Sequence, residues 1–285
     1  MESVREIKKI LKNKPTIEGA GVHLKRVFGY HEVPLLDPFL LLDDFGSENP
    51  DDYLAGFPWH PHRGIETVTY MLQGEVEHGD SIGNSGVIKS GDVQWMTAGN
   101  GIIHQEMPKR HEGYMRGFQL WVNLPAASKM MNPRYRDVIK DTIPEISPQK
   151  GVKIKIISSD VGGTKGPVQD LVIDTEYIDV TMAPNTEFEH PTKKGYKSFA
   201  YIIEGSGYFN LKKKKLLDNG HIVIYEDGDK VKITSTENHL RFLFISGKPI
   251  GEPVAWYGPI VMNTQEELDL AFSEYRSGSF IKYRG

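Results

Sequence analysis

The 285-residue sequence contains no cysteine, and this absence excludes several kinds of site. Disulfides, thiolate zinc sites, iron–sulfur clusters and a cysteine nucleophile all need a residue type that the chain does not have. An excess of basic charge is absent too, because 34 Lys and Arg residues face 38 Asp and Glu residues, for a net charge of -4. A dedicated nucleic-acid-binding protein usually carries a basic excess or stripe. Direct contact with nucleic acid is therefore not expected.

Long apolar segments are also missing. No apolar run approaches the roughly 20 residues that are needed to span a bilayer. The first residues, MESVREIKK, lack the apolar core of a secretory signal. The lack of cysteine fits a reducing compartment. We therefore expect a cytoplasmic protein without a membrane segment, or a nuclear one if the source is eukaryotic.

Short runs rich in Val, Ile, Tyr and Phe alternate with frequent glycine and proline. Four such runs cover residues 67–72, 152–157, 198–203 and 240–245. This spacing is typical of antiparallel β-sandwiches or barrels. Long amphipathic helices are scarce, and the best candidate extends from Thr264 to Arg276. Thr264 could cap this helix and Gly278 could end it.

Two stretches of the chain resemble one another weakly. Residues 69–74 end in a glycine and are followed by Gly91-Asp92, while residues 201–205 end in a glycine and are followed by Gly228-Asp229. The repeat suggests an internal duplication of a β-domain. Between the copies, residues 132–151 are polar and contain three prolines, Pro133, Pro144 and Pro148. We expect an N-terminal domain over residues 1–135, a linker over 136–150 and a C-terminal domain over 151–285.

Two short pairs of polar residues, His60-Pro-His62 and His104-Gln-Glu106, are separated by forty-one residues that read as β-structure. Side chains two residues apart on a strand point to the same face. Pairing the two strands would therefore bring all four side chains together. Three imidazoles and a carboxylate suit a divalent first-row metal with open positions for water, substrate or oxygen. The sequence predicts such a metal centre in the N-terminal domain.

A single His-x-His pair is weak support, since surface strands carry such pairs by chance. The second pair strengthens the prediction because it follows Gly99-Asn-Gly101, a turn that could return the chain to the first pair. The other histidines lack ligand spacing. His190 is followed two residues later by Thr192, and His239 by Arg241, so the C-terminal domain is expected to be metal-free.

Four further residues are candidates for the surroundings of the metal. Trp59 flanks His60 and could line a pocket, although strand alternation would point it the other way. Glu66 shares the strand parity of His62 and could be a fifth ligand, or it could pair with a nearby arginine. Asp43 and Gln119 are polar residues in apolar settings, and buried polar groups need partners. They could support the metal ligands, or lie in a local turn or at the surface.

These motifs resemble those of the pirin family of the cupin superfamily. The first cupin motif is recognisable from Gly56 to Gly74 and the second from Gly91 to Glu106. The segments more specific to pirins are LDPFLLLD (36–43), HPHRG (60–64), QWMTAG (94–99), LWVNL (120–124) and GPIVMN (258–263). They are spread over nearly the whole chain.

The resemblance implies an all-β bicupin fold, with two antiparallel jelly-roll β-barrels packed face to face and a short C-terminal helix. It also implies one metal, usually iron, held in the N-terminal barrel at the positions of His60, His62, His104 and Glu106. Glu66 matches a position that does not bind the metal in pirins, whereas Asp43 and Gln119 match polar positions near it. Iron(II) is the expected cofactor, and manganese, nickel, cobalt or copper would also accept this ligand set.

The resemblance leaves more than one function open. Several pirins are similar in activity to quercetin 2,3-dioxygenase, which implies a small aromatic substrate and O2. In that reaction Glu106, as a ligand or a detached base, would accept the proton of the substrate hydroxyl. Other pirins are regulators whose iron state controls binding to a transcription factor or metabolic enzyme. A cupin that uses its metal only as a Lewis acid is a third reading.

Overall fold

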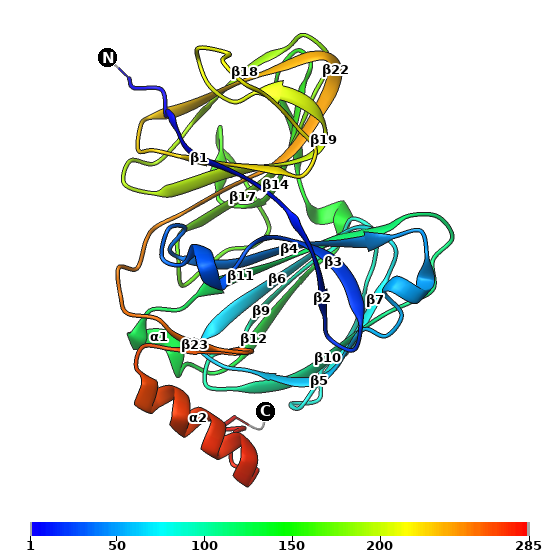
Figure 1. The fold of residues 1–285 in the computed structure, drawn as a ribbon, viewed down its shortest axis with the longest axis vertical. Coiled ribbons are helices and arrows are strands. Elements are labelled where there is room, and N and C mark those ends of the chain that lie inside the picture. Colours follow the sequence, from blue (N-terminus) through cyan, green and yellow to red (C-terminus); the bar gives the residue numbers. More distant parts are fainter. Residues whose placement is uncertain (1, 284–285) are drawn as a thin grey trace. The chain divides into compact units, whose positions relative to one another are not determined.

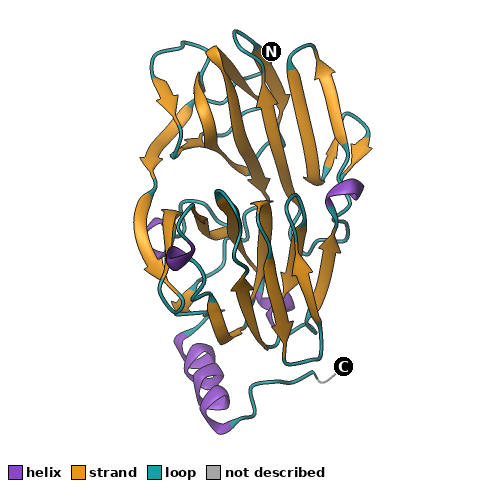
Figure 2. Cartoon of the chain, turned by 90° about the vertical axis from the view of Figure 1, so that its right-hand side faces the viewer, coloured by secondary structure: helices purple, strands orange, loops and turns teal. Residues whose placement is uncertain are grey.

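The computed structural model describes residues 2–283 and consists mainly of β-strands (Figure 2). The chain divides into two compact units, each assembled from separate segments. One contains the motif histidines and is called the histidine unit; it comprises Lys14–Leu35, Phe39–Lys140 and Ile250–Gly285. The other, called the second unit, comprises Met1–Asn13, Leu36–Pro38 and Asp141–Pro249. The domain boundaries expected from the sequence stay a prediction, because these units are not continuous stretches of chain.

The histidine unit contains two larger sheets, a hairpin and short helices. Its seven-stranded sheet has the order β12 (Arg134–Val138), β9 (Val93–Thr97), β6 (Ile65–Gln73), β11 (Met115–Asn123), β4 (Phe39–Ser47), β3 (Val22–Phe28) and β2 (Lys14–Glu18). Its four-stranded sheet has the order β5 (Phe57–His62), β10 (Ile102–Pro108), β7 (Val76–Asp80) and β8 (Ser85–Ile88). The hairpin pairs β23 (Ala255–Tyr257) with β24 (Ile260–Met262). The helical segments are η1 (Tyr30–Glu32), η2 (Pro50–Asp52), α1 (Ala126–Lys129) and α2 (Gln265–Ser277).

The second unit is built around a nine-stranded sheet. Its main path has the order β1 (Ile7–Lys12), β21 (His221–Tyr225), β19 (Lys197–Tyr208), β22 (Lys230–Gly247), β17 (Thr175–Met182), β14 (Val152–Ser158) and β13 (Glu145–Gln149). Two more strands join from the side, β18 (Glu187–Pro191) on β22 and β20 (Leu216–Asp218) on β19. A small hairpin pairs β15 (Asp160–Val161) with β16 (Thr164–Lys165). The short 3-10 helix η3 (Lys140–Thr142) contains the chain position at which the histidine unit ends and the second unit continues.

The four apolar runs singled out in the sequence are confirmed as strands β6, β14, β19 and β22. The expected jelly-roll barrels take the form of sheets that backbone hydrogen bonds do not close. Among residues 2–283, β1 pairs along the main path only with β21, and β13 only with β14, so the two ends of the nine-stranded path do not meet. Closure requires the two edge strands to pair with each other. The sheets of both units are therefore open.

Side-chain alternation explains how the strands form a core. In β14, Val152, Ile154 and Ile156 are buried while Lys153 between them is exposed. The period of two places alternate residues on opposite faces of a sheet. In β10 the buried positions alternate in the same way, and they include His104 and Glu106. The strand that carries the second motif thus turns its polar pair inward.

The expected C-terminal helix is confirmed as α2, which follows the β23–β24 hairpin (Figure 1). Thr264 caps it, since its hydroxyl accepts a hydrogen bond from the Glu267 N–H while the Glu267 carboxylate accepts from the Thr264 N–H. Gly278 ends the helix in the left-handed region at φ +75°. Across residues 2–283 the structure has no helix with the length and apolar character needed to cross a membrane.

Candidate metal centre

The two motif strands pair as the sequence predicts. β5 and β10 are antiparallel neighbours, and His60 lies directly opposite His104. The ring centres of His60 and His62 are 4.8 Å apart, those of His60 and His104 4.4 Å, and those of His62 and His104 5.0 Å. Their ligand nitrogens lie within 4.8 Å of one another. The three imidazoles therefore form one cluster that could hold a metal ion.

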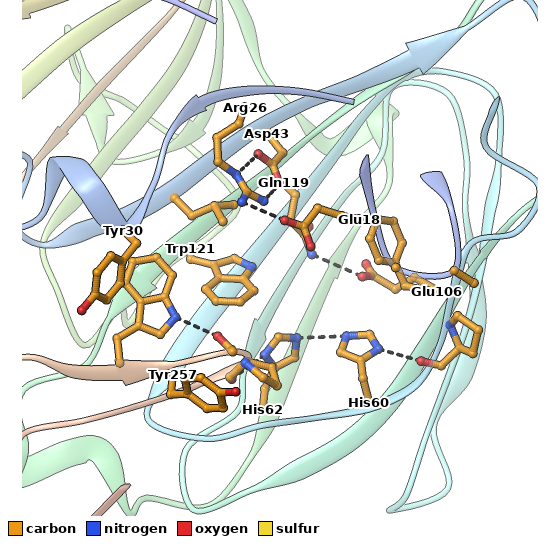
Figure 3. Close-up of a pocket in the computed structure, with 18 residues that line it drawn as sticks. Glu18, Arg26, Tyr30, Asp43, His60, His62, Glu106, Gln119, Trp121 and Tyr257 are labelled. Atoms are coloured by element: carbon orange, nitrogen blue, oxygen red, sulfur yellow. Dashed lines mark hydrogen bonds and ion pairs between the residues drawn. The ribbon is translucent and has the colours of Figure 1, made fainter. Parts of the chain in front are cut away.

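Backbone carbonyl groups fix the tautomers of two of these rings. His60 Nδ1 lies 2.9 Å from the Pro58 carbonyl oxygen, and His62 Nδ1 lies 3.0 Å from the Pro259 carbonyl oxygen. A carbonyl oxygen only accepts hydrogen bonds, so each Nδ1 carries the proton and each Nε2 has a free lone pair. These two Nε2 atoms face each other at 3.1 Å (Figure 3). Two lone pairs repel at this distance unless a cation lies against both.

His104 supports the same conclusion. Both of its ring nitrogens are buried and have no hydrogen-bond partner. A buried polar atom without a partner is costly, and coordination of a metal would satisfy one of these nitrogens. The residues present therefore fit a divalent metal ion bound by imidazole nitrogens.

Burial also keeps the three histidines in the form that a metal needs. It lowers the pKa of His60 and lowers the pKa of His62 and His104 well below 6.5, because an imidazolium ion is poorly solvated in the protein interior. Neutral imidazole is the metal-binding form. The cluster is thus ready to coordinate without first losing protons at neutral pH.

Glu106 lies in the same cavity as the histidines, and a hydrogen bond joins its carboxyl group to Gln119 (Figure 3). Its oxygens lie 3.1 Å from Thr69 Oγ1 and 3.3 Å from Gln119 Nε2. Burial raises the pKa of Glu106 to about 7, against the effect of these two hydrogen bonds. Its place in the metal coordination stays a prediction, because the cluster of close ligand atoms consists of the three imidazoles.

The hydrogen bonds of Thr69 indicate which form of Glu106 fits the site without metal. Thr69 Oγ1 lies 2.6 Å from Gln119 Oε1 as well as 3.1 Å from Glu106 Oε1. A hydroxyl group has one proton and can donate to one of these oxygens. A protonated Glu106 would donate to Thr69, which would then donate to Gln119. The geometry therefore suits a neutral carboxyl group at this position.

Of the other residues predicted to surround the metal, Asp43 lines the cavity, whereas Trp59 and Glu66 do not. Asp43 lines the cavity and accepts two hydrogen bonds from Arg26, at 2.9 and 2.8 Å. Burial raises the pKa of Asp43 to about 6, although the bonds from Arg26 act in the opposite direction. Trp59 is 53% exposed and is not one of the residues that line the cavity. Glu66 is fully buried, where it accepts hydrogen bonds from Trp95 Nε1 and Thr97 Oγ1.

An aromatic wall beside the histidines was not identified from the sequence. The Trp121 ring stands edge-on to His62 at 5.1 Å, and Trp256 lies 5.9 Å beyond it. Tyr30 and Tyr257 line the same side of the cavity, which has a volume of about 770 Å³ (Figure 3). Trp121 could have been found, because it is two residues from Gln119 and shares its strand face. Trp256 and Tyr257 precede the pirin-like segment GPIVMN (258–263), but both lie far from the histidine motifs in the sequence, so spacing gives no sign that they reach this cavity.

Comparisons with known proteins show what the chain as a whole is similar to. The chain matches the family model Pirin over residues 21–122 and the Pirin C-terminal cupin domain over residues 177–281. A pirin-like protein of Caulobacter vibrioides is 45% identical over 278 residues, which cover 97% of this chain and 99% of that protein. A crystal structure named quercetin 2,3-dioxygenase from Acinetobacter baumannii has a TM-score of 0.90 and 32% identity, and the match covers 98% of this chain and 99% of that one.

A more distant structure, a bacterial pirin from Escherichia coli in complex with nickel(II), has a TM-score of 0.66 and 19% identity, covering 85% of this chain and 99% of that one. At this identity it supports the fold alone. The expected fold of two cupin domains with a short C-terminal helix is confirmed. The chain belongs to the pirin family.

Proposed function

We propose that this protein is a mononuclear non-haem metalloprotein with dioxygenase activity toward quercetin or a related flavonol or enolic aromatic compound. The observation that carries the proposal is a pair of unprotonated ring nitrogens, His60 Nε2 and His62 Nε2. They face each other 3.1 Å apart in a cavity with aromatic walls. The similarity to the Acinetobacter baumannii protein supports the class of substrate.

His60, His62 and His104 would hold the metal, with Glu106 either as a fourth ligand or as a detached base. Iron(II) is the metal that we favour, and manganese, nickel, cobalt or copper are alternatives for the same nitrogen and oxygen donors. The bound metal would supply a Lewis-acid and redox centre at which an enolic hydroxyl group and O2 can meet.

The cavity walls would bind and orient a flat substrate. The indole rings of Trp121 and Trp256 offer apolar surface next to His62, and aromatic rings pack favourably against one another. On another part of the wall, Glu18 and Asp43 are both paired with Arg26. Their remaining oxygen lone pairs could accept hydrogen bonds from phenolic hydroxyl groups, so a neutral polyphenol suits this wall better than an anionic substrate.

Glu106 is the residue that we propose as the proton acceptor. A general base works best when its pKa lies near the pH of the reaction, and burial raises the pKa of Glu106 to about 7. Its carboxyl group lies in the same cavity as the histidines, where Thr69 and Gln119 hold it in place. It could therefore take the proton from the substrate hydroxyl and keep it away from bulk water.

The decisive experiment is a turnover assay on reconstituted protein. Metal-free protein is loaded with iron(II) without air, mixed with quercetin and then with O2, and the loss of flavonol absorbance is recorded together with carbon monoxide release. We expect metal-dependent turnover in the wild type. His104→Ala should lose most of its bound metal and its activity, because it removes one of the three imidazoles in the cluster.

The matched control is His23→Ala, which removes an exposed histidine of the same unit. This variant should keep both metal and activity. Glu66→Gln should also keep its metal, since Glu66 is bonded to Trp95 and Thr97 instead. A wild type that binds iron stoichiometrically but does not consume quercetin or O2 would contradict the dioxygenase proposal. Full metal content in His104→Ala would contradict the ligand assignment.

A further inference from the structure

A segment near the C-terminus runs beside the end of β5, the strand that carries His60 and His62. His62 Nδ1 donates to the Pro259 carbonyl at 3.0 Å, and the next contact along is the Val261 N–H donating to the Arg63 carbonyl at 3.1 Å. Lys129 Nζ then bridges the Gly64 carbonyl at 2.9 Å and the Val261 carbonyl at 3.0 Å. Residues 259–261 therefore run alongside residues 62–64, although almost 200 residues separate the two segments in the chain.

The Arg63 side chain ties the same segment to both ligand strands. Its guanidinium group is 2% exposed and donates to the Glu274 carboxylate at 2.7 Å and to the Phe280 carbonyl at 2.8 Å. Its Nε donates to the Asn100 carbonyl at 2.8 Å, in the turn that leads into β10. The Phe280 ring lies 4.2 Å from the guanidinium carbon. One buried arginine thus joins helix α2, the residues after it, the end of β5 and the entry to β10.

This arrangement matters for the cluster because His62 needs a particular tautomer. Its Nε2 can bind a cation only while the ring proton stays on Nδ1, and the acceptor for that proton is a carbonyl group of the C-terminal segment. Outer partners of this kind hold a ligating ring in place and make it a stronger ligand. A displaced segment would leave His62 free to turn or to place its proton on Nε2.

We propose that residues 259–280 act as a brace that sets the tautomer and orientation of His62, with Arg63 and Glu274 as positioning residues for the metal. The proposal rests on the metal centre of the proposed function. It adds a role for a part of the chain that lies outside the motif strands. The brace works through Arg63, the residue that follows His62, because its side chain holds Glu274 of α2 against the end of β5.

The test uses Glu274→Ala in the full-length protein. It removes an acceptor from the buried Arg63 guanidinium and loosens the hold of α2 on the end of β5. Nickel(II) affinity is measured by calorimetric titration, and we expect a loss of about tenfold, within the range seen for changes to the partners of metal ligands. Long-range ¹H–¹⁵N spectra of metal-free protein report the second effect, which is loss of the protected Nδ1–H signal of His62.

Two further variants separate positioning from general damage. Glu274→Gln keeps an oxygen that can accept from Arg63 and should restore most of the affinity and the Nδ1–H signal. Lys282→Ala removes the other partner of Glu274, an ammonium group 2.7 Å from Oε1, and leaves the pair with Arg63 intact. Its affinity and histidine spectrum should match the wild type.

Phe280→Ala gives a second, milder loosening, since it removes the ring against the Arg63 guanidinium. It decides the question if Glu274→Ala does not fold, and it should lower affinity in the same direction. Wild-type affinity and a wild-type His62 signal in either folded variant would overturn the proposal. A wild-type protein that does not bind nickel(II), iron(II) or cobalt(II) would instead contradict the metal centre itself.

Discussion

Glu106 places an ionisable carboxyl group inside the histidine unit, where burial raises its pKa from 4.5 to about 7. Between these two pH values the folded metal-free protein keeps a proton that the unfolded chain has already released. Stability contributed by this proton is therefore lost as the pH rises toward 7. We predict that raising the pH from 5.5 to 8 lowers the free energy of unfolding of the wild type by about 2 kcal/mol more than that of Glu106→Gln.

The measurement is urea unfolding of both metal-free proteins at the two pH values. The three histidines act in the opposite direction, because their lowered pKa values make the unfolded chain bind more protons as the pH falls. This contribution is common to both proteins and cancels in the comparison. An identical pH dependence in wild type and Glu106→Gln would show that the carboxyl group titrates normally.

Single residues also show how far the sequence predicts the site. His60, His62 and His104 could be found because alternation along a strand is a local rule that spacing reveals. Pro259 could not, because it acts through its backbone carbonyl and every residue has one. Trp59 shows that being next to a candidate ligand in the sequence does not place a residue in the cavity. On a strand such a neighbour points to the other face, and Trp59 is 53% exposed.

Among the structural elements, the end of β5 depends on one glycine. Gly64 has φ +79°, and a Cβ atom there would overlap the Val261 carbonyl oxygen. We predict that Gly64→Ala destabilises the histidine unit by roughly 2–4 kcal/mol, since it combines backbone strain with the displacement of residues 259–261. Thermal and urea unfolding of the metal-free protein would measure this loss.

Gly83 provides the matched control in the same unit. It has φ +95°, and a Cβ atom there would meet nothing within 4 Å. Gly83→Ala should therefore lose only about 1–2 kcal/mol, from the unfavourable backbone conformation alone. Equal losses in the two variants would mean that the close approach at Gly64 contributes nothing.

Elements were predicted well where local chemistry decides them. Helix α2 could be predicted from Thr264 and Gly278, because helix capping depends on residues close to the helix ends in the sequence. Whether the nine-stranded sheet closes could not be predicted, because closure depends on whether its edge strands β1 and β13 pair with each other. No pattern within either strand indicates this. The hairpin that supplies Trp256 and Pro259 to the cavity is a similar case, since its partners in the fold are far away in the chain.

At the scale of the whole molecule, chain order does not give the compact units. Residues 250–285 belong with the histidines, whereas residues 1–13 belong to the second unit. All four tryptophans, Trp59, Trp95, Trp121 and Trp256, lie in the histidine unit. Tryptophan emission therefore reports the unfolding of this unit alone.

This distribution makes the linkage between metal and fold measurable in one unit of the intact chain. A metal that binds only the folded state adds about 2.7 kcal/mol of stability when its free concentration is 100 times its Kd. This gain corresponds to a rise in Tm of roughly 5–10 °C for a unit of this size. We predict this rise in the tryptophan-detected melting of the wild type with nickel(II), and none in His104→Ala. Since Trp95 is fully buried, opening of the unit exposes its indole ring to water and changes its emission. A wild-type Tm that stays constant while nickel(II) saturates the protein would place the metal somewhere other than the imidazole cluster.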